Sequence, residues 1–159
     1  PYSSCILSDA VKDHTIHREY AAIVSGKTDE SGTIDLPIAR KDGSTIERVL
    51  DPERGETAVT HYRTFAYNKN ADLSFIRLLL ETGRTHQIRV HMKAIGHPLP
   101  GDFLYCPDYR FIDRQPLHST YLSFSHPVTG EKLEFSAPLP GDMRKLFPNI
   151  KDPSGPVFY

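Results

Sequence analysis

The segment from Thr82 to Gly101 gathers basic and imidazole side chains and contains no Asp or Glu. Its basic residues are Arg84, Arg89 and Lys93, and its histidines are His86, His91 and His97. The whole chain has a formal net charge of only −1, so this positive charge is concentrated locally rather than a property of the composition. A cluster of this kind favours an anionic ligand.

The spacing of the residues predicts that this segment turns from a strand into a helix. The apolar run in 71–81 has the length of a strand, and Thr82-Gly83 interrupts it. From His86 the apolar residues recur at helical spacing until Gly96, which ends the helix. We expect Thr85 to be the N-cap, because its hydroxyl can accept an unpaired backbone N–H. The N-terminus of such a helix, next to Arg84, is a site for phosphate.

Two alternatives compete with an anion site. A basic helix face that only contacts water is the simplest one. A zinc site at His86 and His91 is disfavoured, because residues five apart on a helix point about 140° away from each other and lack the i, i+4 spacing of helical ligand pairs. The same angle argues against a phosphodiesterase that uses these two histidines. We therefore predict no metal.

The surrounding elements predict an α+β fold, with a mostly antiparallel mixed sheet and a few helices packed on one side of it. The polar stretches 26–55 and 99–115 are predicted to be loops, the first with little core. The chain length suits a single domain over 1–159. Strands are predicted at 15–25, 56–68 and 71–81, a hairpin at 120–135, and helices at 4–12 and 141–147.

The composition limits the function further. No apolar run approaches the ~20 residues that span a bilayer, and no Rossmann or P-loop glycine pattern supports a nucleotide cofactor. Cys5 and Cys106 form no CxxC pair, which indicates a reducing, cytoplasmic location. The near-neutral net charge is unusual for a freestanding electrostatic nucleic-acid binder. The chain starts in what reads as the middle of a helix, without Met, which suggests a fragment.

The sequence TGRTHQIRVHMKAIGHPLPGD, at 82–102, resembles the signature of the RluA-type pseudouridine synthases. HREYAAIV, at 17–24, resembles the strand on which this family carries its active-site tyrosine, and LHSTYLSFSHP, at 117–127, resembles a late strand. Their order and spacing match the family from about 13 to 147. The resemblance implies a pseudouridine-synthase-like catalytic domain that isomerises uridine within structured rRNA or tRNA, without a cofactor or metal.

The resemblance also implies roles for individual residues. Tyr20 would contact the uracil, and stacking on such an aromatic ring repays part of the cost of flipping the base out of the RNA. Arg89 would hold the nucleophilic Asp, because a guanidinium binds a carboxylate through two hydrogen bonds and lowers its pKa. Either Leu117 or Leu122 would form the apolar wall beside the uracil. The predicted RNA-contacting residues are Arg84, Thr85, His86, Gln87 and Lys93.

One departure from the family decides what this chain can do alone. The family's nucleophile lies in an Arg-Leu-Asp segment upstream of the tyrosine strand, and this sequence contains no Arg-Leu-Asp. Asp9, Asp13 and Asp102 lie in the wrong context, so we expect an N-terminally truncated domain in which Arg89 lacks its anion and which is inactive alone. The alternative is a non-catalytic RNA-binding relative or fragment. Loss of a strand-bearing segment should also expose a sheet edge and promote self-association.

Overall fold

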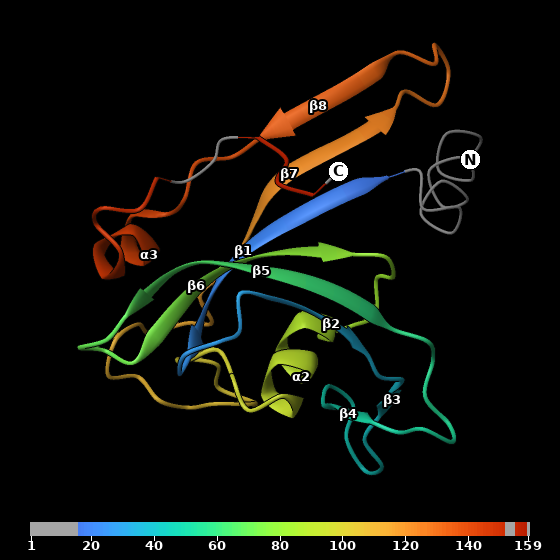
Figure 1. Ribbon diagram of the computed structural model, residues 1–159. Helices are drawn as coiled ribbons and strands as arrows, with labels where there is room; N and C mark the ends of the chain where they lie inside the picture. Colours follow the sequence, from blue (N-terminus) through green and yellow to red (C-terminus); the bar gives the residue numbers. More distant parts are fainter. Residues whose placement is uncertain (1–15, 152–154, 159) are drawn as a thin grey trace.

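The computed structural model describes residues 16–151 and 155–158. Within them, six strands form one sheet in the order β2-β5-β6-β1-β7-β8, and all of its pairings are antiparallel (Figure 1). These strands are β1 (His17–Ser25), β2 (Ser31–Asp35), β5 (Val59–Asn68), β6 (Leu73–Leu80), β7 (Leu117–Ser125) and β8 (Lys132–Ser136). The other elements are the two-stranded sheet of β3 (Ile38–Arg40) and β4 (Arg48–Leu50), and the helices α2 (Gln87–Ala94) and α3 (Gly141–Leu146). The predicted α+β fold with a mostly antiparallel sheet is confirmed.

The central strands are buried on both faces. Ala22 and Val24 of β1 pack with Ile88 and Met92 of α2 on one face of the sheet. Their neighbours Ala21 and Ile23, which point to the opposite face, pack in the cluster that contains Met143 of α3. The two helices therefore cover opposite faces, and the prediction that they lie on one side was wrong. A strand that is apolar on both faces requires cover on both.

The stretch 26–55 was predicted to be a loop with little core, and this was wrong. It contains β2, β3 and β4, and Ile34 and Ile38 are 4% and 3% exposed. Strands of three to five residues are too short to show a clear alternation of apolar and polar side chains. Ile38 belongs to a small cluster with Val90 of α2 and Tyr105, so the β3–β4 hairpin is anchored against the helix.

The other predicted elements agree with the structure within a few residues. The strand at 15–25 corresponds to β1, and those at 56–68 and 71–81 to β5 and β6, while 141–147 corresponds to α3. The predicted hairpin is β7–β8, and 99–115 carries no strand longer than an isolated bridge. The predicted helix at 4–12 lies outside the described residues. No helix in the described part of the chain is long and apolar enough to cross a membrane.

Candidate functional site

The connection from β6 into α2 differs from the predicted cap. The N-cap is His86, whose backbone adopts a left-handed conformation with φ of 58° and whose side chain makes no capping hydrogen bond. Thr85, the predicted cap, is exposed. The side chain of Gln87 closes this turn instead, because its Oε1 accepts the Thr82 hydroxyl at 2.8 Å and the Arg84 N–H at 2.9 Å.

Gln87 also joins the helix to the sheet. Its Nε2 donates to the carbonyl of Val59 at 2.9 Å and to the hydroxyl of Thr60 at 3.0 Å. The residue is 2% exposed, and both ends of its amide are engaged within the protein. The Gln87 side chain therefore fixes the start of α2 on β5, and contact between Gln87 and RNA stays a prediction.

His91 is a core residue and not a ligand. It is fully buried, with Nδ1 within 2.9 Å of the Thr60 hydroxyl and Nε2 within 2.9 Å of the Leu36 carbonyl oxygen. Burial lowers its pKa, with smaller opposing contributions from the Leu36 carbonyl and Asp35. Because neither ring nitrogen is available, His91 cannot form a catalytic pair with His86, and the phosphodiesterase alternative fails.

Arg89 holds an anion from its own chain. Its Nε donates to Asp102 Oδ2 and its Nη2 to Asp102 Oδ1, both at 2.6 Å. The two side chains are 8% and 1% exposed. The expectation that Arg89 would lack a carboxylate was therefore wrong. Helical periodicity placed Arg89 on an outward face, and the chain from Gly101 onward returns to cover it.

Asp102 is ionised and fixed in place. Burial acts to raise the pKa of its carboxyl, but hydrogen bonds from Arg89 and from the backbone N–H groups of Leu104 and Tyr105 outweigh this and lower the pKa. These N–H groups lie 3.0 and 3.2 Å from Oδ1. The carbonyl of Asp102 also accepts the N–H of Cys106 at 2.8 Å, which closes the turn.

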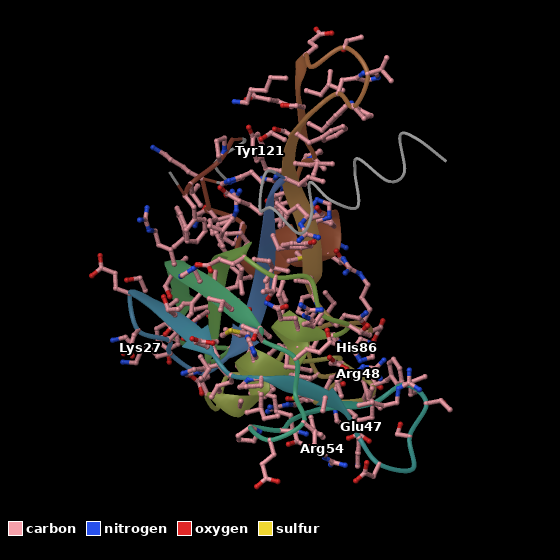
Figure 2. The ribbon with its side chains drawn as sticks, turned by 90° about the vertical axis from the view of Figure 1, so that its right-hand side faces the viewer. Lys27, Glu47, Arg48, Arg54, His86 and Tyr121 are labelled. Carbon is pink, nitrogen blue, oxygen red and sulfur yellow. The ribbon has the colours of Figure 1, made fainter. Side chains whose placement is uncertain are left out.

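Tyr105 joins the β3–β4 hairpin to α2. Its hydroxyl accepts the backbone N–H of Arg48 at 2.8 Å and lies 2.9 Å from His86 Nδ1. Its ring centroid is 4.8 Å from the Arg89 guanidinium carbon and 5.7 Å from Lys93 Nζ. We call these five residues the Tyr105 cluster. Figure 2 shows His86 and Arg48 side by side where hairpin and helix meet, and Arg54 in the segment that follows β4.

The positive charge of 82–101 is smaller than the sequence indicated. Burial lowers the pKa of His86, and the positive charges of Arg89 and Arg48 lower it further against a weaker effect of Asp102. Burial also keeps His91 neutral, and the negative charge of Asp102 balances the positive charge of Arg89. Arg84 is paired with Glu56. Lys93 is the cation of this segment that is exposed and has no carboxylate partner among the described residues.

Further cations come from the hairpin, which the sequence analysis did not consider. A cavity of about 290 Å³ between the hairpin and the start of α2 is lined by Arg40, Arg48, Arg54, Glu56, Arg84 and Thr85, among others. Arg54 is paired with Asp42 and Asp51, and Arg84 also donates to the Thr57 carbonyl at 3.1 Å. Among the described residues, the guanidinium of Arg48 donates to the backbone carbonyls of Ile46 and Glu47, both at 3.2 Å. No described carboxylate pairs with Arg40 or Arg48, so the cavity retains positive charge.

Tyr20 lies on the face of the sheet that α2 covers. It is partly buried against the same apolar cluster as Ile88, Met92 and Leu117. Leu122 lies directly opposite Arg18 in the β1–β7 pairing, so it shares this face but is not part of the cluster. Of the two leucines proposed as the apolar wall, the packing groups Leu117 with Tyr20.

Arg18 is a basic residue of this face that the sequence analysis missed. Two of its guanidinium nitrogens lie 3.2 Å from the position that a Cβ would take at Gly83, so the side chain crosses the turn before α2. Its Nε is buried without a hydrogen-bond partner among the described residues. Only the pairing of β1 with β6 brings these distant segments together.

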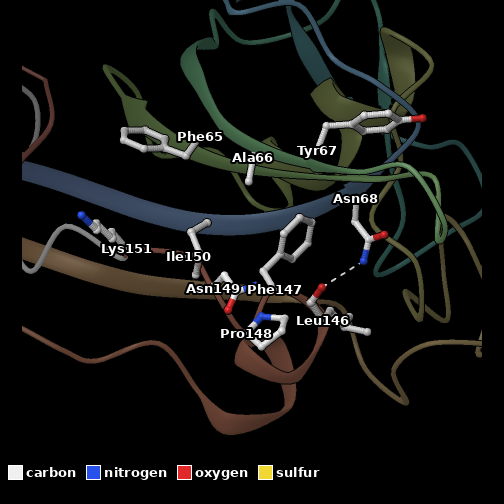
Figure 3. Close-up of a pocket in the computed structure, with 10 residues that line it drawn as sticks. All are labelled: Phe65, Ala66, Tyr67, Asn68, Leu146, Phe147, Pro148, Asn149, Ile150 and Lys151. Atoms are coloured by element: carbon white, nitrogen blue, oxygen red, sulfur yellow. Dashed lines mark hydrogen bonds between the residues drawn. The ribbon is translucent and has the colours of Figure 1, made fainter.

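A larger cavity lies elsewhere and carries no comparable chemistry. It has a volume of about 470 Å³ and lies between β5 and the segment after α3, with Phe65, Tyr67, Phe147, Ile150 and Lys151 among its lining residues (Figure 3). A hydrogen bond of 3.2 Å from Asn68 Nδ2 to the Leu146 carbonyl crosses one side. Its lining includes no carboxylate and no histidine, so we place the candidate site at α2.

Comparisons with known proteins show what the chain is similar to. The family model described as RNA pseudouridylate synthase matches residues 3–94, which is more than half of the chain. The chain is 50% identical over 146 residues to the uncharacterized RNA pseudouridine synthase YjbO of Bacillus subtilis, covering 91% of this chain and 50% of that protein. It is 43% identical over 148 residues to the ribosomal large subunit pseudouridine synthase D of Zymomonas mobilis, covering 85% and 45% of the two chains.

The fold is also similar to a solved structure. Human RNA pseudouridylate synthase domain containing 1 superposes with a TM-score of 0.72 at 26% identity, covering 85% of this chain and 59% of that one. The chain thus spans about half the length of the curated relatives that it matches.

Proposed function

The chain belongs to the RNA pseudouridylate synthase family, and on that basis we propose that the protein isomerises uridine to pseudouridine within structured rRNA or tRNA in the cytoplasm. The observation that carries this proposal is the buried guanidinium of Arg89 in the first turn of α2, at the end of the RTHQIR segment. A buried arginine on the same helix side of the sheet as an accessible tyrosine suits a reaction that needs both an ionised carboxylate and a platform for a base.

The proposed roles divide the work among four side chains. The nucleophilic carboxylate comes from an Arg-Leu-Asp segment that this sequence does not contain. Arg89 keeps that carboxylate ionised, since a neighbouring guanidinium opposes the rise in pKa that burial causes. Tyr20 stacks on the flipped uracil, and Leu117, which packs on the same cluster as Tyr20, is the better candidate for the apolar wall.

RNA would bind across the Tyr105 cluster and the adjoining arginine-lined cavity. Lys93, Arg40 and Arg48 carry positive charge that no described carboxylate balances, and phosphate contacts of this type dominate affinity for nucleic acid. Thr85 and Arg84 line the same cavity. His86 would contribute as a neutral hydrogen-bonding group, because its pKa is lowered.

A specific observation favours binding without catalysis for this chain alone. Among the described residues, Asp102 is the carboxylate that Arg89 holds, and both of its carboxylate oxygens are engaged in that pair and in the turn that follows. It is therefore unavailable as a nucleophile. We propose that the 159-residue chain binds RNA but does not isomerise uridine.

Release of tritium from RNA that contains uridine labelled at carbon 5 tests both statements. We expect release by the product of the complete natural gene, loss of release in its Arg89→Ala variant, and none by the 159-residue chain. A gel-shift measurement with the same RNA should still show binding by the chain. Absence of release by the complete gene product across rRNA and tRNA would contradict the enzymatic proposal, and release by the chain itself would show that the nucleophile is misplaced.

A further inference from the structure

A guanidinium has two edges that can each bind a carboxylate, and the structure shows one edge of Arg89 occupied. Asp102 bridges Nε and Nη2 with two hydrogen bonds of 2.6 Å. The other edge consists of Nη1 and the second hydrogen of Nη2. This paired geometry is specific to arginine, because the planar fork presents its donors in fixed directions.

Contacts above the plane of the Arg89 guanidinium fix its orientation, in addition to the hydrogen bonds within that plane. Its carbon lies 4.8 Å from the ring centroid of Tyr105 and 5.6 Å from that of Phe103. Cation–π contacts of this kind hold a guanidinium against an aromatic ring. Tyr105 is itself held through its hydroxyl by the hairpin and His86. The aromatic rings therefore restrict tilting of the group, while Asp102 restricts its rotation.

Asp102 has little freedom to follow Arg89 if the arginine moves. The backbone N–H groups of Leu104 and Tyr105 hold its carboxylate. Before it, Gly101 has φ of 74°, and a Cβ there would lie 2.5 Å from the Ile112 carbonyl oxygen. The chain is thus tightly packed immediately before Asp102, and a residue with a side chain cannot replace this glycine without strain.

The second edge of Arg89 remains open. No described residue accepts a hydrogen bond from Nη1. Nη1 is also not among the buried side-chain nitrogens without a hydrogen-bond partner in the described part of the chain, such as Arg18 Nε and His118 Nε2. Because Nη1 has no hydrogen-bond partner and is not fully buried, it is accessible to solvent. The geometry therefore leaves donors free for a second anion beside a carboxylate that is already bound.

We propose that Asp102 is a positioning residue, which fixes Arg89 by one edge so that the Nη1 edge presents its N–H groups to a second carboxylate. This rests on the proposed function, in which the second carboxylate is the nucleophile. Asp102 touches neither substrate nor nucleophile and acts through Arg89. Its negative charge also offsets part of the arginine's positive charge, so that the nucleophile is held ionised without being fully neutralised.

The test compares variants of the complete gene product in the tritium-release assay. Asp102→Asn keeps the shape of the side chain but removes its charge and one acceptor. We expect kcat to fall at least about tenfold with KM for the RNA changed less than twofold, since small misplacements of a catalytic group cost up to about 10²-fold. Because removal of the Asp102 charge leaves Arg89 more positive, the nucleophile's pKa should fall and the acid limb of the kcat profile should move to lower pH.

Asp102→Glu and Asp142→Asn complete the design. Asp102→Glu retains the charge but displaces the carboxylate, so kcat should fall while the acid limb of the pH profile keeps its position. If Asp102→Asn does not fold, the result for Asp102→Glu tests the positioning role. Asp142 forms the same two-bond pair with Arg114, at 2.8 and 2.9 Å, but both side chains are 41% exposed and lie at α3. Asp142→Asn should leave kcat, KM and the pH profile unchanged.

The outcomes separate this inference from the proposed function. Unchanged kcat in both Asp102 variants, or a fall in kcat with a proportional rise in KM and no movement of the acid limb in Asp102→Asn, overturns the positioning role. If the unsubstituted gene product releases no tritium, the proposed function has failed. The positioning role is then judged by NMR of the 159-residue chain, where a slowly exchanging Arg89 Nε–H signal that is lost in Asp102→Asn supports it and an unaltered signal contradicts it.

Discussion

Glu19 in β1 and Arg77 in β6 form an ion pair, 2.9 Å between Oε2 and Nη2, in which both side chains are completely buried. The carboxylate of Glu19 also accepts the backbone N–H groups of Val157 and Phe158, at 2.9 to 3.1 Å. One buried charge in the centre of the sheet thus holds the segment at 155–158 on the strands. The pair lies on the opposite face of β1 from Tyr20, since neighbouring residues of a strand point to opposite faces.

Glu19→Gln should lower the free energy of unfolding by about 3 kcal/mol, because it breaks a buried ion pair and removes the carboxylate that accepts the N–H groups of Val157 and Phe158. Urea unfolding of the 159-residue chain measures this. The matched control is Glu134→Gln in the exposed Lys132–Glu134 pair of β8, where we expect no measurable change. Equal effects of the two substitutions would contradict the structural role of Glu19.

His91 should make the fold less stable as the pH falls below about 6.5. Burial lowers its pKa in the folded state, so the unfolded chain takes up a proton first and gains stability from it. The contribution is complete above the unfolded pKa and is lost as the pH falls from there toward the folded pKa, by at most about 1.4 kcal/mol per pH unit. His91→Gln should reduce the slope of unfolding free energy between pH 7 and 5. An unaltered slope would argue against a neutral His91.

Asp102 should contribute to stability in a lower pH range. Its folded pKa is lowered below the ordinary value of 3.8, so the stabilisation is present above about pH 4 and is lost as the pH falls through the folded pKa. In urea unfolding at pH 5, 4, 3 and 2, Asp102→Asn should be less stable than the unsubstituted chain at pH 5, with the difference shrinking toward pH 2. A constant difference at every pH would contradict an ionised Asp102.

Tyr105→Phe should loosen the β3–β4 hairpin while leaving the ring against Arg89. The substitution removes the hydroxyl that accepts the Arg48 N–H and contacts His86. We expect faster hydrogen exchange at the Arg48 amide and a loss of about 1 kcal/mol in unfolding free energy. Tyr109→Phe, at a side chain that is 48% exposed, serves as the control. Unchanged exchange at Arg48 would show that Tyr105 does not anchor the hairpin.

Lys93→Ala should weaken RNA binding and reduce the slope of log K against log salt by about one, as expected for the loss of one phosphate contact. The residue is exposed and has no carboxylate partner in the described part of the chain. Binding is measured by fluorescence anisotropy from 50 to 200 mM salt. Lys132→Ala, at a lysine already paired on the distal hairpin, is the control. If Lys93→Ala keeps the full slope, Lys93 lies outside the interface.

The long elements could be predicted from the sequence because their apolar residues repeat at the period of their own secondary structure. Alternation identifies β5, and the apolar run identifies β6. The spacing of apolar residues does not show which element covers each face of the sheet. That α3 lies on the opposite face from α2 became clear only from the packing of Ala21 and Ile23. The strands of the β3–β4 hairpin were missed because three residues hold too little pattern.

The candidate site was only partly predictable, because its contacts join residues far apart in the sequence. The motif drew attention to Arg89, but the turn at Gly101 that returns Asp102 to it depends on the packing of residues 112–114. Tyr105 and Arg48 meet across 57 residues. A glycine followed by an acidic residue shortly after a basic helix is the signal that could have indicated the pair of Arg89 and Asp102.

The four hydrogen bonds of Gln87 mean that the turn before α2 cannot adjust independently of the sheet. If this part of the protein is rigid, the bound RNA has to change its own shape to fit the site. We therefore expect the site to prefer RNA loops that change shape easily. Flexible loops should be modified faster than stiff loops with the same nucleotide sequence.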